Sequence, residues 1–211
     1  MHYNLKRARL LTHINHMMLN ESKYHVSPEE MLSEQREIEA AKADPAKFET
    51  LYNRYYEPIL QFVYKRVEGK EAAFDITSQV FLNAMLKLSQ FKFMGTPFSS
   101  WLYRIALNEI NMLYRKDKVQ RSIKVEEDEL KSVMQEISPE DDIDAQYQRV
   151  AELLSDFAEE DIQLIELRFF EKRAFKEIGD ILNMTENNAK VKLYRLLDKL
   201  KSQLTISKKT A

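Results

Sequence analysis

The sequence predicts an all-α protein made of two small helical domains joined by an acidic linker. Three observations support this prediction. Apolar residues recur at spacings of three and four along most of the chain, which is the period of an amphipathic helix. The chain has only three glycines in 211 residues, too few for a fold rich in tight hairpins. It has no cysteine, and its length is sufficient to bury a core without disulfides.

The first 47 residues are expected to form an N-terminal extension that is partly helical or disordered. Their one helical pattern covers residues 28–43 and is mostly polar. All four histidines of the chain also lie in this extension. Since no cysteine and no cluster of carboxylates accompanies them, we expect no metal site and no cofactor.

Three helices are predicted between residues 48 and 117, which form the first expected domain. The apolar stripe of the first helix runs from Phe48 to Val63. The second helix is expected to begin at a cap on Asp75 and to continue to Leu88. After a break that contains glycine and proline, the third stripe runs from Phe98 to Leu113.

Residues 118–149 are predicted to form an acidic linker, with short helical turns at most, because they lack a sustained apolar stripe. Helical spacing resumes at Val150. The second expected domain therefore covers residues 150–204 and is followed by a short tail, 205–211.

The segment from Phe175 to Arg195 has the layout of a helix-turn-helix. Gly179 is small where the helices must approach closely, Asn183 tolerates the left-handed backbone of a tight turn, and Thr185 can cap the second helix. Such a second helix presents polar side chains to base edges and phosphates. An ordinary helical hairpin with a solvated polar face is the alternative.

The net charge of −2 hides a segregation of charge along the chain. Residues 99–124 carry six basic and two acidic side chains, and residues 162–211 carry eleven and six. Between them, residues 125–161 carry two basic and fourteen acidic side chains. Two basic segments joined by an acidic one suit a protein that binds nucleic acid at two places.

Two strings in the first domain, together with the second domain, resemble a known family. The strings Asp75-Ile-Thr-Ser-Gln-Val-Phe-Leu-Asn-Ala and Trp101-Leu-Tyr-Arg-Ile-Ala-Leu-Asn resemble region 2 of bacterial sigma factors of the extracytoplasmic-function (ECF) group. Residues 150–204 are similar to region 4 of the same family, including its helix-turn-helix. The resemblance covers residues 48–117 and 150–204, in the family's order.

The resemblance implies a sigma factor, which binds core RNA polymerase, recognises the minus-35 and minus-ten promoter elements and promotes transcription initiation. Its partners would be core polymerase and promoter DNA, both as duplex and as melted strand, with an anti-sigma factor as a further partner. It implies no catalytic residue, so we expect no enzyme. We also expect a monomer when free, a cytoplasmic location and no membrane insertion, because no apolar stretch is long enough.

The resemblance also implies three groups of binding residues. Those matched to core-polymerase binding are Asp75, Ile76, Gln79, Phe81 and Asn83. Those matched to the minus-ten element are Phe91, Phe93, Met94, Thr96, Arg104, Asn108, Arg115 and Lys116. Those expected to reach the minus-35 element, which are the outward residues of the recognition helix, are Thr185, Glu186, Asn187, Asn188, Lys190, Lys192, Tyr194 and Arg195. Phe81 could instead belong to the core, and Trp101 is expected to be core rather than a stacking platform for a base.

Two alternatives stay open at this point. The acidic segment could mimic nucleic acid inside a basic polymerase channel, or it could be a solvated linker that keeps the two basic domains apart. The whole chain could instead be a stand-alone helix-turn-helix transcriptional regulator that binds duplex DNA as a dimer. A hydrolase or nuclease finds no support, because the carboxylates crowd the linker and every histidine lies in the N-terminal extension.

Overall fold

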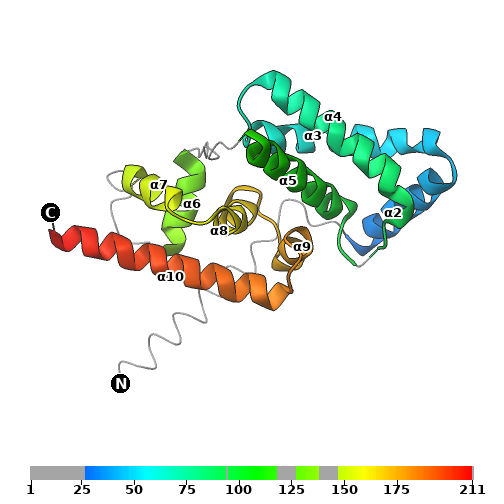
Figure 1. The fold of residues 1–211 in the computed structure, drawn as a ribbon. Coiled ribbons are helices and arrows are strands. Elements are labelled where there is room, and N and C mark those ends of the chain that lie inside the picture. Colours follow the sequence, from blue (N-terminus) through cyan, green and yellow to red (C-terminus); the bar gives the residue numbers. More distant parts are fainter. Residues whose placement is uncertain (1–26, 94, 118–126, 138–146, 211) are drawn as a thin grey trace.

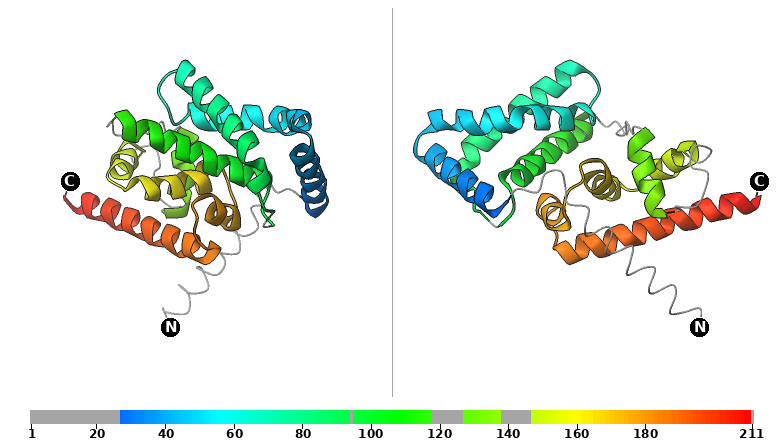
Figure 2. Two further views of the ribbon diagram at one scale, coloured as in Figure 1. Left: turned by 45° about the vertical axis from the view of Figure 1, so that its right-hand side comes forward. Right: turned by 180° about the vertical axis from the view of Figure 1, so that it is seen from behind.

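The computed structural model describes residues 27–93, 95–117, 127–137 and 147–210, and every regular element in these ranges is helical (Figure 1). The all-α prediction is therefore confirmed. The helices gather into two bundles that lie side by side and pack against each other, as two further views show (Figure 2). We call α2 to α5 the N-terminal bundle and α6 to α10 the C-terminal bundle.

The N-terminal bundle consists of four α-helices and two short 3-10 turns. In chain order they are α2 (Pro28–Ala43), η1 (Pro45–Lys47), α3 (Phe48–Tyr64), α4 (Lys70–Lys87), η2 (Leu88–Gln90) and α5 (Phe98–Asp117). The helices α3, α4 and α5 contact one another pairwise. Each supplies a buried stripe, with Ile59 on α3, Val80 on α4 and Leu102 on α5 all inaccessible to solvent. The three stripes predicted between residues 48 and 117 therefore form one core.

Helix α2 lies in the expected N-terminal extension and packs against α3. It begins with a capping box, in which the Ser27 hydroxyl accepts from the Glu30 amide and the Glu30 carboxylate accepts from the Ser27 amide. Its inner face buries Ile38 and Ala41. This mostly polar helix therefore contributes to the core of the N-terminal bundle.

The predicted start of the second helix was wrong. Helix α4 begins at Lys70, and Gly69 adopts φ +86° just before it. Asp75 lies inside the helix and is exposed, so it caps nothing. The positive φ of Gly69 ends the preceding turn, and the chain re-enters a helix at once.

The C-terminal bundle contains five α-helices and one π-helical turn. They are α6 (Glu127–Ile137), α7 (Tyr147–Ser155), α8 (Glu159–Ile165), the π turn η4 (Glu166–Phe170), α9 (Phe175–Ile181) and α10 (Glu186–Thr210). Helix α6 comes from the segment expected to be a linker. It buries Leu130, Val133, Met134 and Ile137, whose spacings of three, one and three place them on one face. Of the rest of that segment, residues 147–149 belong to α7, and 118–126 and 138–146 lie outside the described residues.

The turn between α9 and α10 has the geometry that the sequence predicts. Asn183 adopts φ +56°, and the Thr185 hydroxyl accepts a hydrogen bond from the Asn188 amide at 3.2 Å. A Cβ on Gly179 would lie 2.7 Å from the backbone oxygen of Met184, so only glycine fits. These three residues fix how α10 leaves the turn.

Candidate functional site

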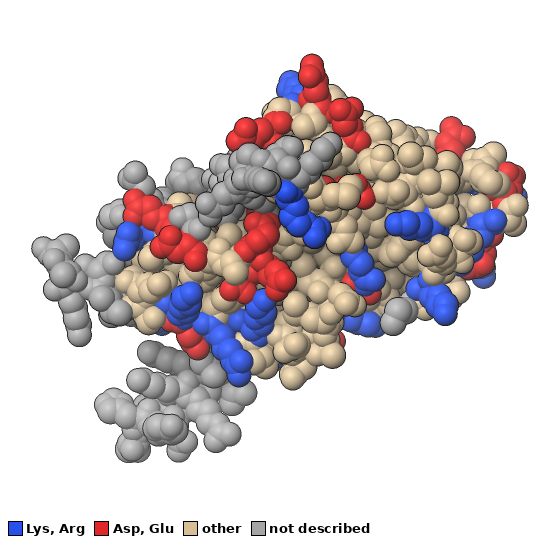
Figure 3. Space-filling model, in the orientation of Figure 1, with Lys and Arg blue, Asp and Glu red and all other residues tan. Residues whose placement is uncertain are grey.

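Helix α4 presents an exposed stripe on the outside of the N-terminal bundle. The stripe consists of Asp75, Gln79, Leu82 and Leu86, at helical spacings of four, three and four. Figure 3 shows a broad area without charge over this part of the molecule. Large exposed apolar side chains on a helix are typical of a protein-binding surface. We call these four residues the α4 stripe.

The residues matched to polymerase binding divide between this surface and the interior. Asp75 and Gln79 belong to the α4 stripe, and Ile76 is half-buried beside them. Phe81 is buried, with its ring 4.9 Å from that of Tyr52, so it packs in the core. Asn83 is half-buried and donates from Nδ2 to Oε1 of Glu109 on α5.

The α4 stripe was missed in part by reasoning from sequence. Leu82 and Leu86 were not singled out, and both are exposed, as is Met85. Helix α4 carries apolar residues around most of its circumference, so helical spacing alone does not separate its buried face from its exposed one. The sequence did carry a signal of this surface, because α4 has more apolar residues than one helix face can bury.

The loop between η2 and α5 holds several of the residues matched to the minus-ten element. Phe93 is 36% exposed at this loop, whereas Phe91 and Thr96 are buried. The Phe91 ring packs at 5.2 Å from both Phe98 and Trp101, which places it at the base of the loop. Trp101 is half-buried against this core, as expected.

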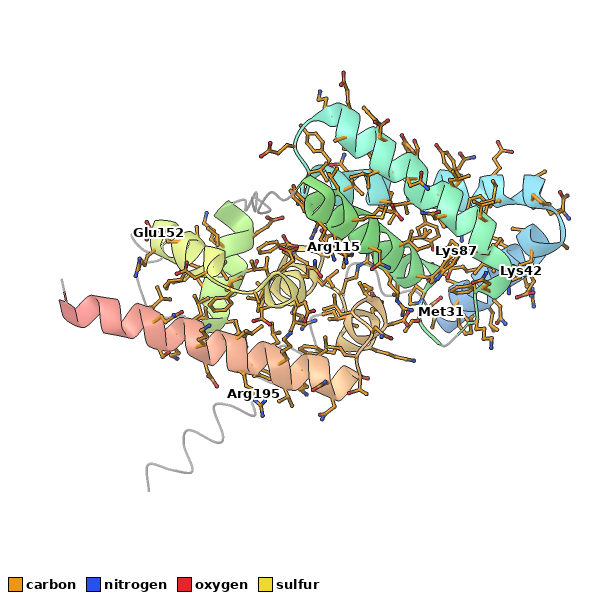
Figure 4. All side chains as sticks on the ribbon, in the orientation of Figure 1. Met31, Lys42, Lys87, Arg115, Glu152 and Arg195 are labelled. Atoms are coloured by element: carbon orange, nitrogen blue, oxygen red, sulfur yellow. The ribbon has the colours of Figure 1, made fainter. Side chains whose placement is uncertain are left out.

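Three more predicted minus-ten residues lie along α5. Arg104 is half-buried, and Asn108, one helical turn further on, is exposed. Arg115 is exposed near the end of the helix, and its Nε donates to the backbone oxygen of Asn111 (Figure 4). Met94 and the side chain of Lys116 lie outside the described residues.

A carboxylate of the C-terminal bundle contacts this part of the N-terminal bundle. Asp180 on α9 accepts a hydrogen bond from the Thr96 hydroxyl at 3.0 Å and forms an ion pair with Arg104. A Cβ on Gly95 would lie 3.1 Å from Nζ of Lys176, which also belongs to α9. Two residues matched to the minus-ten element therefore contact the first helix of the helix-turn-helix.

A buried ion-pair cluster joins the two bundles at a second point. Arg66, which follows α3, lies 3.1 Å from a carboxylate oxygen of Glu166 and 3.0 Å from one of Glu171. Its guanidinium also stacks on the Phe62 ring at 3.6 Å. Nearby, the Arg173 guanidinium lies 4.2 Å from the centre of the Tyr103 ring. Charged groups buried in this way are stabilised only while their partners stay in place.

The residues expected to reach the minus-35 element lie on the first turns of α10. Glu186, Asn187 and Asn188 are exposed, as is Arg195, which points away from the rest of the bundle (Figure 4). Thr185 precedes the helix as its cap and is also exposed. Lys and Arg side chains gather over the same helix in the surface view (Figure 3).

Other residues that are expected to reach the minus-35 element make contacts within the protein. Lys192 lies 2.8 Å from a carboxylate oxygen of Asp161 and 3.8 Å from one of Glu160. Lys190 is half-buried. Tyr194 packs against the core, and burial together with the Glu136 carboxylate raises the pKa of its hydroxyl. The exposed face of α10 therefore comprises fewer residues than the sequence predicted.

Within the described residues, no group of three or more histidine, aspartate or glutamate side chains is placed to hold a metal ion. No helix in that part of the chain combines the length and the apolar character needed to cross a bilayer. All four histidines lie in residues 1–26, outside the described ranges.

Comparison with known proteins links these surfaces to one family. A family model described as Sigma-70 region 2 matches residues 51–119. The ECF RNA polymerase sigma factor BldN of Streptomyces coelicolor is 28% identical over 161 residues, which cover 75% of this chain and 61% of BldN. The ECF RNA polymerase sigma factor SigW of Bacillus subtilis is 26% identical, over 83% of this chain and 98% of SigW. Both relatives are ECF sigma factors, so the chain resembles this family over most of its length.

The fold of the chain also matches a solved structure. CnrH, solved in complex with the cytosolic domain of CnrY, aligns over 81% of this chain and 95% of the CnrH chain, with a TM-score of 0.51 and 20% identity. In the family's terms, the matched part of the N-terminal bundle is region 2. The C-terminal bundle, with its helix-turn-helix, stands where region 4 is expected.

Proposed function

We propose that the protein is an ECF sigma factor, which binds core RNA polymerase, recognises the minus-35 and minus-ten promoter elements and promotes transcription initiation. The observation that carries the proposal is the alignment with SigW, which covers 98% of that protein and 83% of this chain and therefore extends into both bundles. The alignment with BldN covers 61% of that longer protein, so its features outside the aligned part carry no weight here.

The α4 stripe is the proposed docking surface for core polymerase. The side chains of Leu82 and Leu86 would be removed from water on binding, and Asp75 and Gln79 would supply the polar contacts. On the inner side of α4, the Phe81 ring is in edge-to-face contact with the Tyr52 ring of α3. This contact helps to hold α4 against α3. The stripe thus offers an apolar centre on a rigid helix.

The DNA contacts are proposed to lie on two other surfaces. Asn187 and Asn188 on α10 can pair with adenine edges in a major groove, and Arg195 can reach a phosphate or a guanine. The loop at Phe93 and the α5 residues Arg104 and Asn108 would meet the melted minus-ten strand. Exposed aromatic and basic side chains can replace part of the stacking that an unpaired base loses.

These surfaces act by binding alone, so we infer that the protein has no catalytic role of its own and works in the cytoplasm, where the polymerase is. We further propose that an anti-sigma factor binds the free protein, which we expect to be a monomer. The CnrH fold, which this chain shares, was solved with the cytosolic domain of a second protein, CnrY.

The test is transcription by a reconstituted holoenzyme. Purified chain is added to bacterial core polymerase with a library of promoter fragments, and the transcripts are sequenced. A shared pair of elements upstream of the new start sites is the expected result, with a known sigma factor as positive control. The double substitution Asn187→Ala and Asn188→Ala should change the preferred minus-35 bases and leave core binding unaltered.

Two results would contradict the proposal. One is the absence of any promoter-dependent transcript while the control sigma factor is active. The other is tight binding of the free chain, as a dimer, to a palindromic duplex with half-sites one helical turn apart. That second result would identify a stand-alone transcriptional regulator.

A further inference from the structure

Two charged side chains of α2 contact the two ends of the loop between η2 and α5. Oε2 of Glu34 accepts a hydrogen bond from the Phe98 amide, at the end of the loop, with a distance of 2.8 Å. Nζ of Lys42 donates to the backbone oxygen of Phe91, at its start, with a distance of 2.9 Å. The loop itself carries Phe93, which the proposed function assigns to the melted strand.

Glu34 acts as an N-terminal cap for α5, although it belongs to another helix. Phe98 is the first residue of α5, and the preceding Pro97 has no side-chain oxygen that could accept the free amide. A carboxylate at a helix N-terminus satisfies that amide and interacts favourably with the helix dipole. Glu34 is only 2% exposed, a costly position for a carboxylate unless its hydrogen bonds stabilise it.

The second carboxylate oxygen of Glu34 accepts from the Tyr55 hydroxyl of α3. Burial, and after it the charge of Glu34, raises the pKa of Tyr55, so the hydroxyl stays a donor at physiological pH. Glu34 is thereby held between α3 and the start of α5. Its geometry depends on both helices.

Lys42 fixes the other end of the loop beside the end of α4. It is half-buried and also forms an ion pair with Glu39 at 2.8 Å. Figure 4 shows Lys42 and Lys87, the last residue of α4, at the same end of the bundle. The backbone oxygen that Lys42 binds comes directly after η2, where no helical hydrogen bond would use it.

The rigidity of α2 sets the distance between the two anchors. Glu34 and Lys42 are eight residues apart on one helix, which corresponds to about 12 Å along its axis. Between them, Ile38 and Ala41 are buried against the rest of the bundle, so α2 cannot easily slide. At the base of the loop, the Phe98 and Trp101 rings pack 5.4 Å apart.

We propose that α2 positions this loop for capture of the melted minus-ten strand, with Glu34 and Lys42 as its positioning residues. This inference rests on the proposed function and assigns a role to a part of the N-terminal extension. A loop whose two ends are fixed before binding loses less conformational entropy when it meets the strand.

The first experiment measures the loop directly and needs no polymerase. Trp101 is the only tryptophan of the chain and packs against the base of the loop, so its fluorescence reports on that region. Glu34→Ala and Lys42→Met should make Trp101 more accessible to acrylamide quenching. Glu34→Gln and Lys42→Arg keep an acceptor and a donor and should leave quenching close to that of the wild type.

The second experiment uses the holoenzyme formed with core polymerase. Its affinity is measured for a single-stranded oligonucleotide with the minus-ten element and, separately, for a duplex with the minus-35 element. Glu34→Ala and Lys42→Met should each weaken the first by about 10-fold, because a hydrogen bond to a charged group is lost at the loop. Binding to the minus-35 duplex should not change.

Glu39→Gln is the matched control, since Glu39 touches Lys42 but not the loop. It should behave as the wild type in both experiments. The proposal is overturned if Glu34→Ala and Lys42→Met alter neither quenching nor oligonucleotide binding, or if they weaken both DNA ligands by the same factor. If the wild-type chain starts no promoter-dependent transcription, the proposed sigma function fails, and the quenching of Trp101 still decides whether α2 holds the loop.

Discussion

Arg104 on α5 and Asp180 on α9 form an ion pair between the two bundles, with Nη2 of Arg104 2.5 Å from Oδ1 of Asp180. The same aspartate accepts from the Thr96 hydroxyl through its other carboxylate oxygen. Both Arg104 and Thr96 are among the residues that we predict to contact the minus-ten element. A carboxylate of the helix-turn-helix therefore holds, in this arrangement, two groups that an anionic DNA strand would need.

Substitution of Asp180 should free these groups for DNA. We expect Asp180→Asn to tighten binding of the free chain to a single-stranded minus-ten oligonucleotide by about 5-fold, because a partly exposed ion pair contributes up to about 1 kcal/mol. Nε of Arg104 has no acceptor among the described residues, so Asp180 does not satisfy the guanidinium fully. Fluorescence anisotropy at two salt concentrations measures the change.

Asp198→Asn is the control for this prediction, since it removes the same charge from an exposed position on α10. It should leave the affinity nearly unaltered. An equal gain in both variants would show that only net charge matters, and that Asp180 does not compete with the strand.

Arg66 is predicted to hold the two bundles together. It is 2% exposed and lies between Glu166 and Glu171, so Arg66→Ala leaves two carboxylates without their buried cation. We expect a loss of about 3–5 kcal/mol in the free energy of unfolding, as for other broken buried ion pairs. Denaturant titration measures the loss, and small-angle scattering should show a larger radius of gyration.

Arg54→Ala provides the comparison, because Arg54 pairs with Glu37 on the surface of the N-terminal bundle. Its cost should not exceed about 1 kcal/mol. If Arg66→Ala costs no more than Arg54→Ala and leaves the radius of gyration unchanged, the cluster does not fix how the bundles pack.

Local patterns predicted much of this molecule from sequence. The helix-turn-helix depends on Gly179, Asn183 and Thr185, whose roles in the turn follow from covalent geometry and capping. The stripes of α3 and α5 were likewise visible as helical spacing. These features need only neighbouring residues, so one sequence is enough to find them.

Features that depend on tertiary contacts could not be predicted in this way. Helix α6 was assigned to a linker, because its four buried apolar residues lie in a strongly acidic segment and form a core with α7, α10 and η4, which follow later in the chain. The contacts of Asp180 with Arg104 and of Glu34 with Phe98 join residues 76 and 64 positions apart. Patterns of residue spacing do not extend over such separations. The sequence also does not reveal which glutamate of a polar helix is buried.

The α4 stripe is predicted to contribute to polymerase affinity through its most exposed apolar residue. Leu86 is 67% exposed, so Leu86→Ser removes apolar surface from the outside without opening a cavity. We expect an affinity for core polymerase lower by about 10-fold, since one fully buried leucine is worth about 1.5–3 kcal/mol. The melting temperature should stay within a few degrees of the wild type.

Leu32→Ser makes the same chemical change on α2, where Leu32 is 57% exposed and outside the α4 stripe. Competition for core polymerase against a labelled sigma factor distinguishes the two variants. Equal affinities for Leu86→Ser and Leu32→Ser would place the docking surface elsewhere.

Arg195 and Lys192 should differ in their effect on minus-35 binding, although both are basic residues of the recognition helix. Arg195 is exposed, so Arg195→Ala should lower the slope of log affinity against log salt by about 1 for a lost phosphate contact. Lys192 already pairs with Asp161 and Glu160, and it must leave these carboxylates to reach DNA. Lys192→Ala should therefore change the slope less.

Titrations of a minus-35 duplex from low to physiological salt measure both slopes. If Lys192→Ala lowers the slope as much as Arg195→Ala, the acidic partners on α8 do not hold Lys192 in solution; if neither variant lowers it, α10 does not face the phosphates.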